Sequence, residues 1–194
     1  SRDPARIAAA SRLVLPGVGA AGPVMAILRE TGLDVLLRAS RTPLLGVCIG
    51  MQVLFERSEE GEVAGLGLLA GTVRRLPAGP GVRLPHMGWN ALQLVGDSPL
   101  LAGIEAGAQA YFVHSYGVAA SDDAIATCTH GQHFCAAVAR GHVAGGEPAL
   151  VEGTGRLLRQ LVVLLEQHRP ARMELAHLAG RDFLFIGIQD FHEL

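Results

Sequence analysis

Short apolar runs alternate with helical patterns along the first 57 residues. The runs at 12–15 and 44–47 are short and largely apolar, which predicts two buried strands. Apolar residues with helical spacing fill the segment between them, interrupted at 31–32, and return over 49–57. Asp3, followed by proline, is a good N-cap for a short helix at the start. This alternation predicts a parallel sheet with right-handed crossovers and a site at the carboxyl ends of its strands.

After residue 58 the pattern changes to strands and turns. A loop bounded by glycine and proline is predicted at 84–90, a helix at 156–168, and a strand-like run at 183–188 that could extend a sheet edge. Further strands, including both arms of a hairpin, are predicted at 71–76, 91–95, 110–113, 124–128 and 134–140. The expected fold class is therefore α/β, with a mostly parallel sheet, flanking helices and an antiparallel extension.

The composition narrows the classes of partner. A chain of 194 residues with 49% hydrophobic residues can form one well-packed domain. The formal net charge of −2 gives no basic surface for nucleic acid or an anionic membrane, and no apolar run reaches membrane-spanning length. The three cysteines suit a reduced cytoplasmic protein, and the first residues lack the apolar core of a signal peptide. A small molecule or another protein is the expected partner.

Cys48 lies at the joint between a predicted strand and the helix after it. The small residues Gly46 and Gly50 tolerate the sharp turn and close backbone approach of such a joint. The helix N-terminus would favour the thiolate of Cys48, and the N–H of Ile49 could donate to an oxyanion. This pattern predicts a cysteine nucleophile. The alternative interpretation is a small core cysteine.

Two other segments could complete a site around Cys48. Two glycines around Val18 let the backbone turn freely, so an N–H of the loop 17–19 could reach the same oxyanion. An ordinary strand-to-helix turn is the alternative. His114, Ser115 and Tyr116 follow a predicted strand and could line a substrate pocket, or simply end that strand.

The loop at 84–90 and the hairpin after it carry less specific signals. Met87 and the only tryptophan, Trp89, would suit a protein interface if exposed, or a loop folded over the core if buried. Two cysteines and two histidines occur around the hairpin turn, but their spacing does not fit a zinc knuckle, so no metal site is predicted; they are Cys128, His130, His133 and Cys135.

Four motifs stand in the order and at the spacing of a known family. They read Leu-Pro-Gly-Val-Gly-Ala at 15–20, Gly-Val-Cys-Ile-Gly-Met-Gln at 46–52, Pro-His-Met-Gly-Trp-Asn at 85–90 and Tyr-Phe-Val-His-Ser-Tyr at 111–116. With them, residues 1 to about 167 resemble the glutaminase subunit of imidazole glycerol phosphate synthase, a class I (triad) glutamine amidotransferase. The Cys48 motif alone would indicate only the superfamily.

The resemblance implies a fold, a reaction and a partner. It implies a flavodoxin-like amidotransferase domain over 1–169, with a tail at 170–194 outside it, and no cofactor or metal. Cys48 would attack L-glutamine and form a thioester, and the ammonia released would pass to a cyclase subunit, a (β/α)₈ barrel in the same heterodimer, for histidine biosynthesis. The implied oxyanion residues are Gly17, Val18, Gly19 and Ile49, the substrate contacts are Gln52, Ser115 and Tyr116, and the barrel contacts are Met87, Gly88 and Trp89.

Two parts of the family pattern have no match. The family's first strand and its asp-tyr-gly-x-gly-asn loop would precede residue 1, so one sheet strand is expected to be missing. The family also has gly-x-gln-phe-his-pro-glu before its last helix, which supplies the histidine base and the glutamate that orients it. Here the chain reads Val-Ala-Gly-Gly-Glu-Pro-Ala-Leu at 143–150.

The end of the chain only partly echoes the unmatched motif. It contains His192 and Glu193, but they follow the last family helix, and we interpret the likeness as chance. A second candidate function is therefore a catalytically impaired relative that binds the cyclase. A third is another cysteine hydrolase with the same joint, for which the Trp89 loop would be a poor fit.

Overall fold

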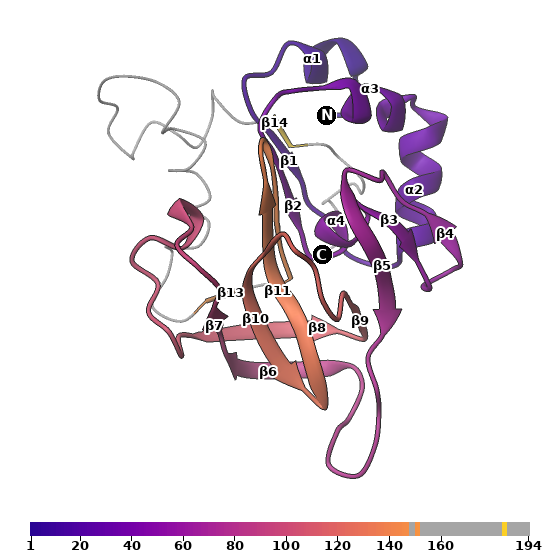
Figure 1. Cartoon of the computed structure of the whole chain (residues 1–194). Helices are drawn as coiled ribbons and strands as arrows, with labels where there is room; N and C mark the ends of the chain where they lie inside the picture. Colours follow the sequence, from indigo (N-terminus) through magenta and orange to yellow (C-terminus); the bar gives the residue numbers. More distant parts are fainter. Residues whose placement is uncertain (148–149, 152–183, 186–194) are drawn as a thin grey trace.

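The computed structural model describes residues 1–147, 150–151 and 184–185, which form three sheets (Figure 1). The main sheet is mixed: its first four strands are parallel and its last three antiparallel. In spatial order these strands are β14 (Leu184–Phe185), β1 (Leu13–Leu15), β2 (Leu44–Val47), β12 (Val143–Gly146), β11 (Gln132–Arg140), β10 (Ala124–His130) and β7 (Gln93–Leu94). The α/β class and the antiparallel extension are confirmed.

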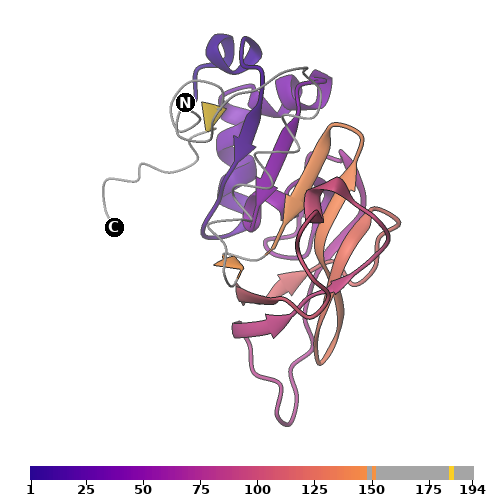
Figure 2. The same ribbon diagram turned by 90° about the vertical axis from the view of Figure 1, so that its left-hand side faces the viewer.

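The helices lie mainly in the N-terminal part, where Figures 1 and 2 show them beside the parallel strands. They are α1 (Pro4–Ala8), α2 (Ala21–Glu30), α3 (Leu33–Ala39), α4 (Ile49–Gln52) and the 3₁₀ helix η1 (Pro99–Leu101). The predicted N-cap is confirmed, because the Asp3 carboxylate accepts from the backbone N–H groups of Ala5 and Arg6. The break at 31–32 is confirmed as well, between α2 and α3.

The helix after Cys48 is shorter than predicted. Helix α4 has four residues, and the chain is already a strand again at Phe55. The backbone carbonyls of Val53 and Leu54 accept from Leu66 and Leu68, at 2.7 and 2.8 Å, so long-range hydrogen bonds replace those of a continued helix. The helical pattern over 49–57 is misleading because Phe55 is buried from a strand.

The second sheet has four strands. Its order is β4 (Val63–Ala64), β3 (Phe55–Ser58), β5 (Leu69–Arg75) and β9 (Tyr116–Gly117). The strand predicted at 71–76 is confirmed as β5, but it is parallel to β3 rather than an antiparallel addition to the main sheet. The reason is the intervening strand β4, which pairs antiparallel with β3 and reverses the chain before β5.

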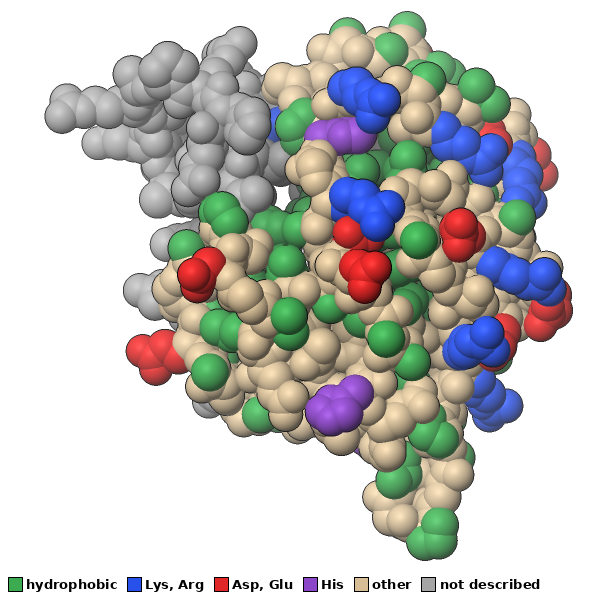
Figure 3. Space-filling model, viewed as in Figure 1, with side chains coloured by type: hydrophobic (Ala, Val, Ile, Leu, Met, Phe, Trp, Pro, Cys, Tyr) green, Lys and Arg blue, Asp and Glu red, His purple; other side chains and the backbone are tan. Residues whose placement is uncertain are grey.

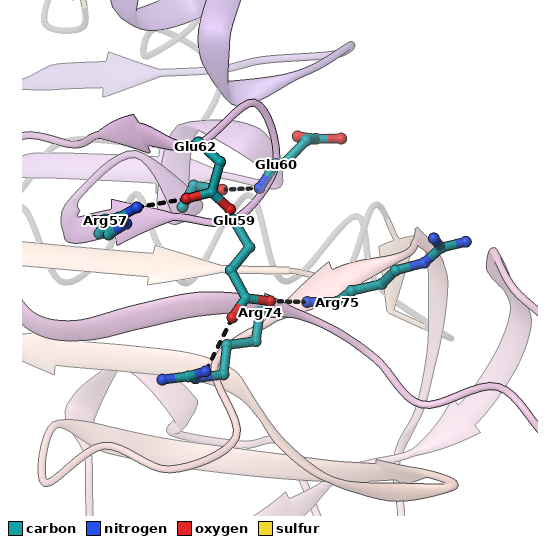
Figure 4. Close-up of polar contacts among 7 residues, drawn as sticks. Arg57, Glu59, Glu60, Glu62, Arg74 and Arg75 are labelled. Carbon is teal, nitrogen blue, oxygen red and sulfur yellow. Dashed lines mark hydrogen bonds and ion pairs between the residues drawn. The ribbon is translucent and has the colours of Figure 1, made fainter.

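Exposed ion pairs connect the loop after β3 to this sheet. The Glu59 carboxylate accepts from Nη1 of Arg74 at 2.9 Å and from the backbone N–H of Arg75, and Arg57 pairs with Glu62 (Figure 4). Positive and negative side chains also lie next to each other along the right-hand edge of the face in Figure 3. Exposed pairs of this kind each stabilise a fold by only about 0.2–1 kcal/mol.

The third sheet has the order β13 (Leu150–Val151), β8 (Gln109–His114) and β6 (His86–Ala91). The segment at 84–90, predicted as a loop, therefore contains a strand. Its cross-strand partners are residues of β8, with Trp89 opposite Tyr111, and long-range pairing of this kind leaves no local sequence signal. The strand predicted at 91–95 is likewise divided, since Ala91 ends β6 and only Gln93 and Leu94 form β7.

Two hydrophobic cores fill the molecule. One packs α1 to α4 against the parallel strands, and the other is formed by residues of η1, β8, β10 and β11 and the segments next to them. The hairpin at 124–140 is confirmed, and Cys128 packs in the second core whereas Cys135 packs in the first. In the described ranges, no three of the His, Cys, Asp and Glu side chains come together as metal ligands, and no helix is long and apolar enough to cross a membrane.

The C-terminal predictions are tested at one place only. The run at 183–188 is confirmed as an added sheet strand at Leu184 and Phe185, because β14 pairs in parallel with β1. The helix predicted at 156–168, the boundary at 169–170 and the segment 187–194 lie outside the described residues.

Candidate active site

Cys48 occupies the joint between β2 and α4, as predicted. Its backbone has φ 54° and ψ −119°, a strained conformation for a residue with a side chain. Its carbonyl accepts from the N–H groups of Met51 and Gln52, and its own N–H donates to the carbonyl of Gly146 at 2.9 Å. The turn is therefore held from the helix on one side and from β12 on the other.

Glycines allow the strands to approach this turn closely. A Cβ atom on Gly50 would lie 1.8 Å from the carbonyl oxygen of Leu15, and one on Gly46 would lie 2.5 Å from the carbonyl oxygen of Gly50. Both obstacles are backbone atoms, which cannot rotate away. The need for small residues at these two positions is therefore confirmed in atomic detail.

The loop at 17–19 packs against the same turn. A Cβ on Gly17 would meet the side chain of Ile49 at 2.0 Å and the backbone nitrogen of Gly50 at 3.3 Å. Gly19 has φ 99°, whereas Val18 is largely exposed. The structure thus brings one predicted oxyanion residue, Gly17, against another, Ile49, which directly follows Cys48. Their role in holding an oxyanion stays a prediction.

The expected thiolate is not favoured at Cys48. Burial and then the nearby Glu147 raise the pKa of the thiol to about 12, against a smaller opposing effect of a hydrogen bond from the Ile49 N–H. The prediction of a lowered pKa is wrong because α4 is only four residues long and its N-terminus is outweighed by burial and a carboxyl group. Within the described residues, no histidine forms a hydrogen bond with Cys48.

Two of the predicted substrate contacts lie together. The side chain of Gln52 is buried, and its Nε2 donates to the Tyr116 carbonyl at 3.1 Å and to the Glu147 carboxyl at 3.2 Å. With both hydrogens used, its Oε1 has no partner among the described residues. Ser115 is next in the chain to Tyr116, half-buried, and its carbonyl accepts from the N–H of Leu76.

Glu147 is a site residue that sequence reasoning missed. It is completely buried, directly after β12, and burial raises the pKa of its carboxyl to about 8. An acidic residue directly after two glycines is the available signal. The family motif expected at that place contains a histidine, so comparison with the motif reveals the absent histidine and gives no reason to select Glu147.

A second missed feature is that His114, predicted only to line a pocket or end its strand, is buried and paired with a second buried histidine, His86. His114 Nδ1 lies 2.9 Å from the Tyr116 carbonyl, and His114 Nε2 lies 3.0 Å from Nδ1 of His86. Asn90 Nδ2 lies 3.3 Å from the remaining nitrogen of His86. Burial lowers the pKa of each imidazole to about 4, so both are neutral at pH 7. The pair joins β6 to the Gln52 side of the site.

The predicted partner surface is exposed. Met87 is 62% and Trp89 52% exposed on the outer face of β6, and Val113, opposite Met87 on β8, is 44% exposed. The ring of Trp89 packs edge-on against Tyr111 at 5.5 Å. The alternative of a loop folded over the core is therefore wrong for Trp89. We call Met87, Trp89, Tyr111 and Val113 the outer patch.

Comparison with known proteins agrees with this geometry. The family model described as Glutamine amidotransferase class-I matches residues 2–145, which ends the match within β12. A solved structure described as a glutamine amidotransferase has the same fold, with a TM-score of 0.63 and 18% identity, over 86% of this chain and 85% of the other. The chain therefore belongs to the class-I glutamine amidotransferases, which are enzymes.

The relatives found by sequence have more specific descriptions than the structure found by its fold. It is 48% identical over 164 residues to the imidazole glycerol phosphate synthase subunit HisH of Xanthomonas euvesicatoria pv. vesicatoria, covering 83% of this chain and 82% of that protein. It is 50% identical over 156 residues to the subunit HisH of Xylella fastidiosa, covering 79% of this chain and 78% of that protein.

Proposed function

We propose that this chain is the glutaminase subunit of an imidazole glycerol phosphate synthase, acting in the cytoplasm in histidine biosynthesis. It hydrolyses L-glutamine to glutamate and ammonia and passes the ammonia to a cyclase subunit. The observation that carries the proposal is Cys48, held at φ 54° between β2 and α4 in a class-I glutamine amidotransferase. Strained residues at such joints are typical of nucleophiles.

The proposed chemistry uses a covalent intermediate. Sγ of Cys48 attacks the carboxamide carbon of glutamine, and the oxyanion that forms is stabilised by the Ile49 N–H and the loop at 17–19. Loss of ammonia leaves a γ-glutamyl thioester, which water hydrolyses to glutamate. The close packing of Gly17 against Ile49 and Gly50 supports this assignment, because it places the two donor segments side by side.

Gln52, Ser115 and Tyr116 are proposed to bind the backbone groups of glutamine. The two hydrogen bonds of Gln52 Nε2 fix the orientation of its amide and leave Oε1 as an acceptor that has no partner among the described residues. A buried acceptor without a partner favours a ligand that donates, and the α-ammonium group of glutamine is such a donor.

The outer patch, with Gly88, is proposed to bind the cyclase, a (β/α)₈ barrel, in a heterodimer. Tryptophan and methionine are enriched where protein interfaces carry most of their binding energy. Here they stand on one face of paired strands, with an aromatic neighbour.

A second candidate function is a catalytically impaired relative that only binds the cyclase. The observation that favours it is the Cys48 thiol, whose pKa of about 12 keeps it protonated, and which has no hydrogen bond to a histidine in the described part of the chain. A neutral thiol is a poor nucleophile unless a base removes its proton during attack.

One experiment separates the two candidates. The chain is mixed with the cyclase subunit, and glutamate formed from glutamine is measured for the wild type, Cys48→Ala and, as a control cysteine in the second core, Cys128→Ala. We expect Cys48→Ala to abolish glutamate release and Cys128→Ala to retain it. Binding to the cyclase with no glutamate above the Cys48→Ala background would instead support the impaired relative.

A further inference from the structure

The backbone places Glu147 directly beside Cys48. Strands β2 and β12 are parallel neighbours, with Val47 opposite Gly146 in the register. Cys48 directly follows β2 and Glu147 directly follows β12. The N–H of Cys48 donates to the Gly146 carbonyl at 2.9 Å. The charge of Glu147 raises the pKa of the Cys48 thiol, and the two side chains form no hydrogen bond with each other in the described residues. Cys48 and Glu147 therefore follow two adjacent strands at the same edge of the main sheet.

One oxygen of Glu147 is held and the other is not. Oε2 accepts from Gln52 Nε2 at 3.2 Å, whereas Oε1 is buried with no hydrogen-bond partner among the described residues. A buried carboxylate oxygen without a donor is unfavourable, and binding a proton relieves it. Burial raises the pKa of this carboxyl to about 8, so the acid and the carboxylate are both accessible near neutral pH.

The other titratable neighbours do not replace this proton site. His114 Nδ1 lies 3.8 Å from Oε2, but it is bonded to the Tyr116 carbonyl and its ring is neutral at pH 7. The groups that face or influence Glu147 are Cys48, Glu60, His114 and Cys135. Glu60 raises the pKa of Glu147 further, and Cys135 is a thiol whose own pKa is raised to about 11.

We propose that Glu147 is the proton acceptor and donor for Cys48, with Oε1 as the exchanging atom. This inference rests on the proposed glutaminase function and deepens it. The Glu147 carboxylate takes the proton of the Cys48 thiol as Sγ bonds to the carboxamide carbon of glutamine. A single negative charge is present before and after this transfer, so no additional charge has to be buried.

Glu147 carries one proton in each half of the remaining cycle. Protonated Glu147 gives it to the departing nitrogen as the C–N bond breaks, which releases ammonia and leaves the thioester with a Glu147 carboxylate. That carboxylate then takes a proton from the water that attacks the thioester. When the C–S bond breaks, Glu147 gives this proton to Sγ. The γ-carboxylic acid that is formed loses its remaining proton to solvent and leaves as glutamate, so the thiol and the Glu147 carboxylate are again in their starting forms.

The test compares Glu147→Gln with Glu59→Gln in the complex with the cyclase. The amide introduced by Glu147→Gln keeps an oxygen that accepts from Gln52, so the fold and the melting temperature are retained, but it cannot exchange a proton. We expect glutamate release to fall by about 10²–10⁴-fold in Glu147→Gln. Glu59→Gln removes an exposed carboxylate paired with Arg74 (Figure 4) and keeps wild-type activity.

The pH profile adds a readout that a merely structural role would not move. Because the carboxylate is the active form, kcat/KM of the wild type rises with pH through a midpoint near 8, and Glu147→Asp keeps this rise at lower activity. Should Glu147→Gln fail to fold, the wild-type profile decides: a flat profile between about pH 6 and 9 overturns the proposal.

The failure of this inference differs from that of the proposed function. Full activity of folded Glu147→Gln together with an inactive Cys48→Ala rejects Glu147 and leaves the glutaminase in place. Full activity of Cys48→Ala rejects the glutaminase mechanism itself.

Discussion

Two regions meet at the candidate site, and they are constructed in opposite ways. The turn at Cys48 is made of backbone and small residues, with Gly46 and Gly50 against carbonyl oxygens. The region behind Gln52 is made of buried polar side chains, with His86 and His114 joined at 3.0 Å. The first region is intolerant of any added atom. The second is intolerant of an added proton.

The direction of the hydrogen bonds explains the second property. The Asn90 amide donates to Nε2 of His86, so Nδ1 of His86 carries a hydrogen and donates to Nε2 of His114. Nδ1 of His114 then donates to the Tyr116 carbonyl. Every nitrogen has one role in this chain of bonds, and protonating either ring would set two donors against each other.

The largest expected effect tests the first region. Gly50→Ala would place Cβ 1.8 Å from the Leu15 carbonyl oxygen, and neither backbone can move without separating β1 from α4. We expect a loss of about 3 kcal/mol or more in the free energy of unfolding, measured by urea denaturation. The control is Gly22→Ala in α2, where a Cβ meets nothing within 4 Å. It should be neutral or stabilising, and equal losses for both would refute the close-approach explanation.

The next effect tests the second region by pH. His86 and His114 have folded pKa values of about 4, below the 6.5 of an unfolded chain. The unfolded chain therefore binds more protons between these values, and the free energy of unfolding falls as the pH drops from 6.5 towards 4.

The loss is on the order of 1–3 kcal/mol for each imidazole, and urea midpoints across this range measure it. In His86→Leu the decline should become shallower, whereas in a variant of the exposed His133, His133→Gln, it should match the wild type. Glu147, whose folded pKa of about 8 lies above its unfolded value, adds stability as the pH falls over the same range and opposes part of this decline. The comparison between variants is therefore decisive, and an equal pH dependence of wild type and His86→Leu would contradict neutral buried histidines.

A smaller effect concerns the outer patch on the same strand as His86. Trp89→Ala should weaken binding of the cyclase by about 2 kcal/mol, roughly 30-fold, while changing stability little because the ring is half exposed. Titration calorimetry with the cyclase measures the affinity. Val35→Ala, which shortens an exposed side chain on α3, is the control and should bind normally. Equal affinity of wild type and Trp89→Ala would remove the patch from the interface.

The sequence is most informative where local rules decide the structure. Asp3 before proline, the glycines beside Cys48 and the hairpin arms at 124–128 and 134–140 each depend on residues close in the chain, and each prediction is confirmed. Prediction from the sequence fails where a segment distant in the chain determines the structure. Phe55 lies in a strand because backbone N–H groups of residues 66, 68 and 69 donate to the carbonyls of the two residues before it. Strand β6 forms because β8 pairs with it.

The site residues show the same difference between local and long-range determinants. Cys48 and the segments at 17–19 and 46–52 could be predicted because their backbone demands are visible in the sequence. Glu147 and the histidine pair could not, since their role depends on burial and on partners 28 to 95 residues away in the chain. Burial also reverses the prediction for the thiol, whose pKa is raised rather than lowered.

In the proposed mechanism Cys48 carries the glutamyl group, which can be detected during turnover. The complex with the cyclase is mixed with glutamine, quenched in acid during turnover, and the peptide containing Cys48 is examined by mass spectrometry. We expect a γ-glutamyl adduct on Cys48 that is absent without glutamine. Glutamate production with no adduct on Cys48, or with an adduct on another residue, would contradict this mechanism.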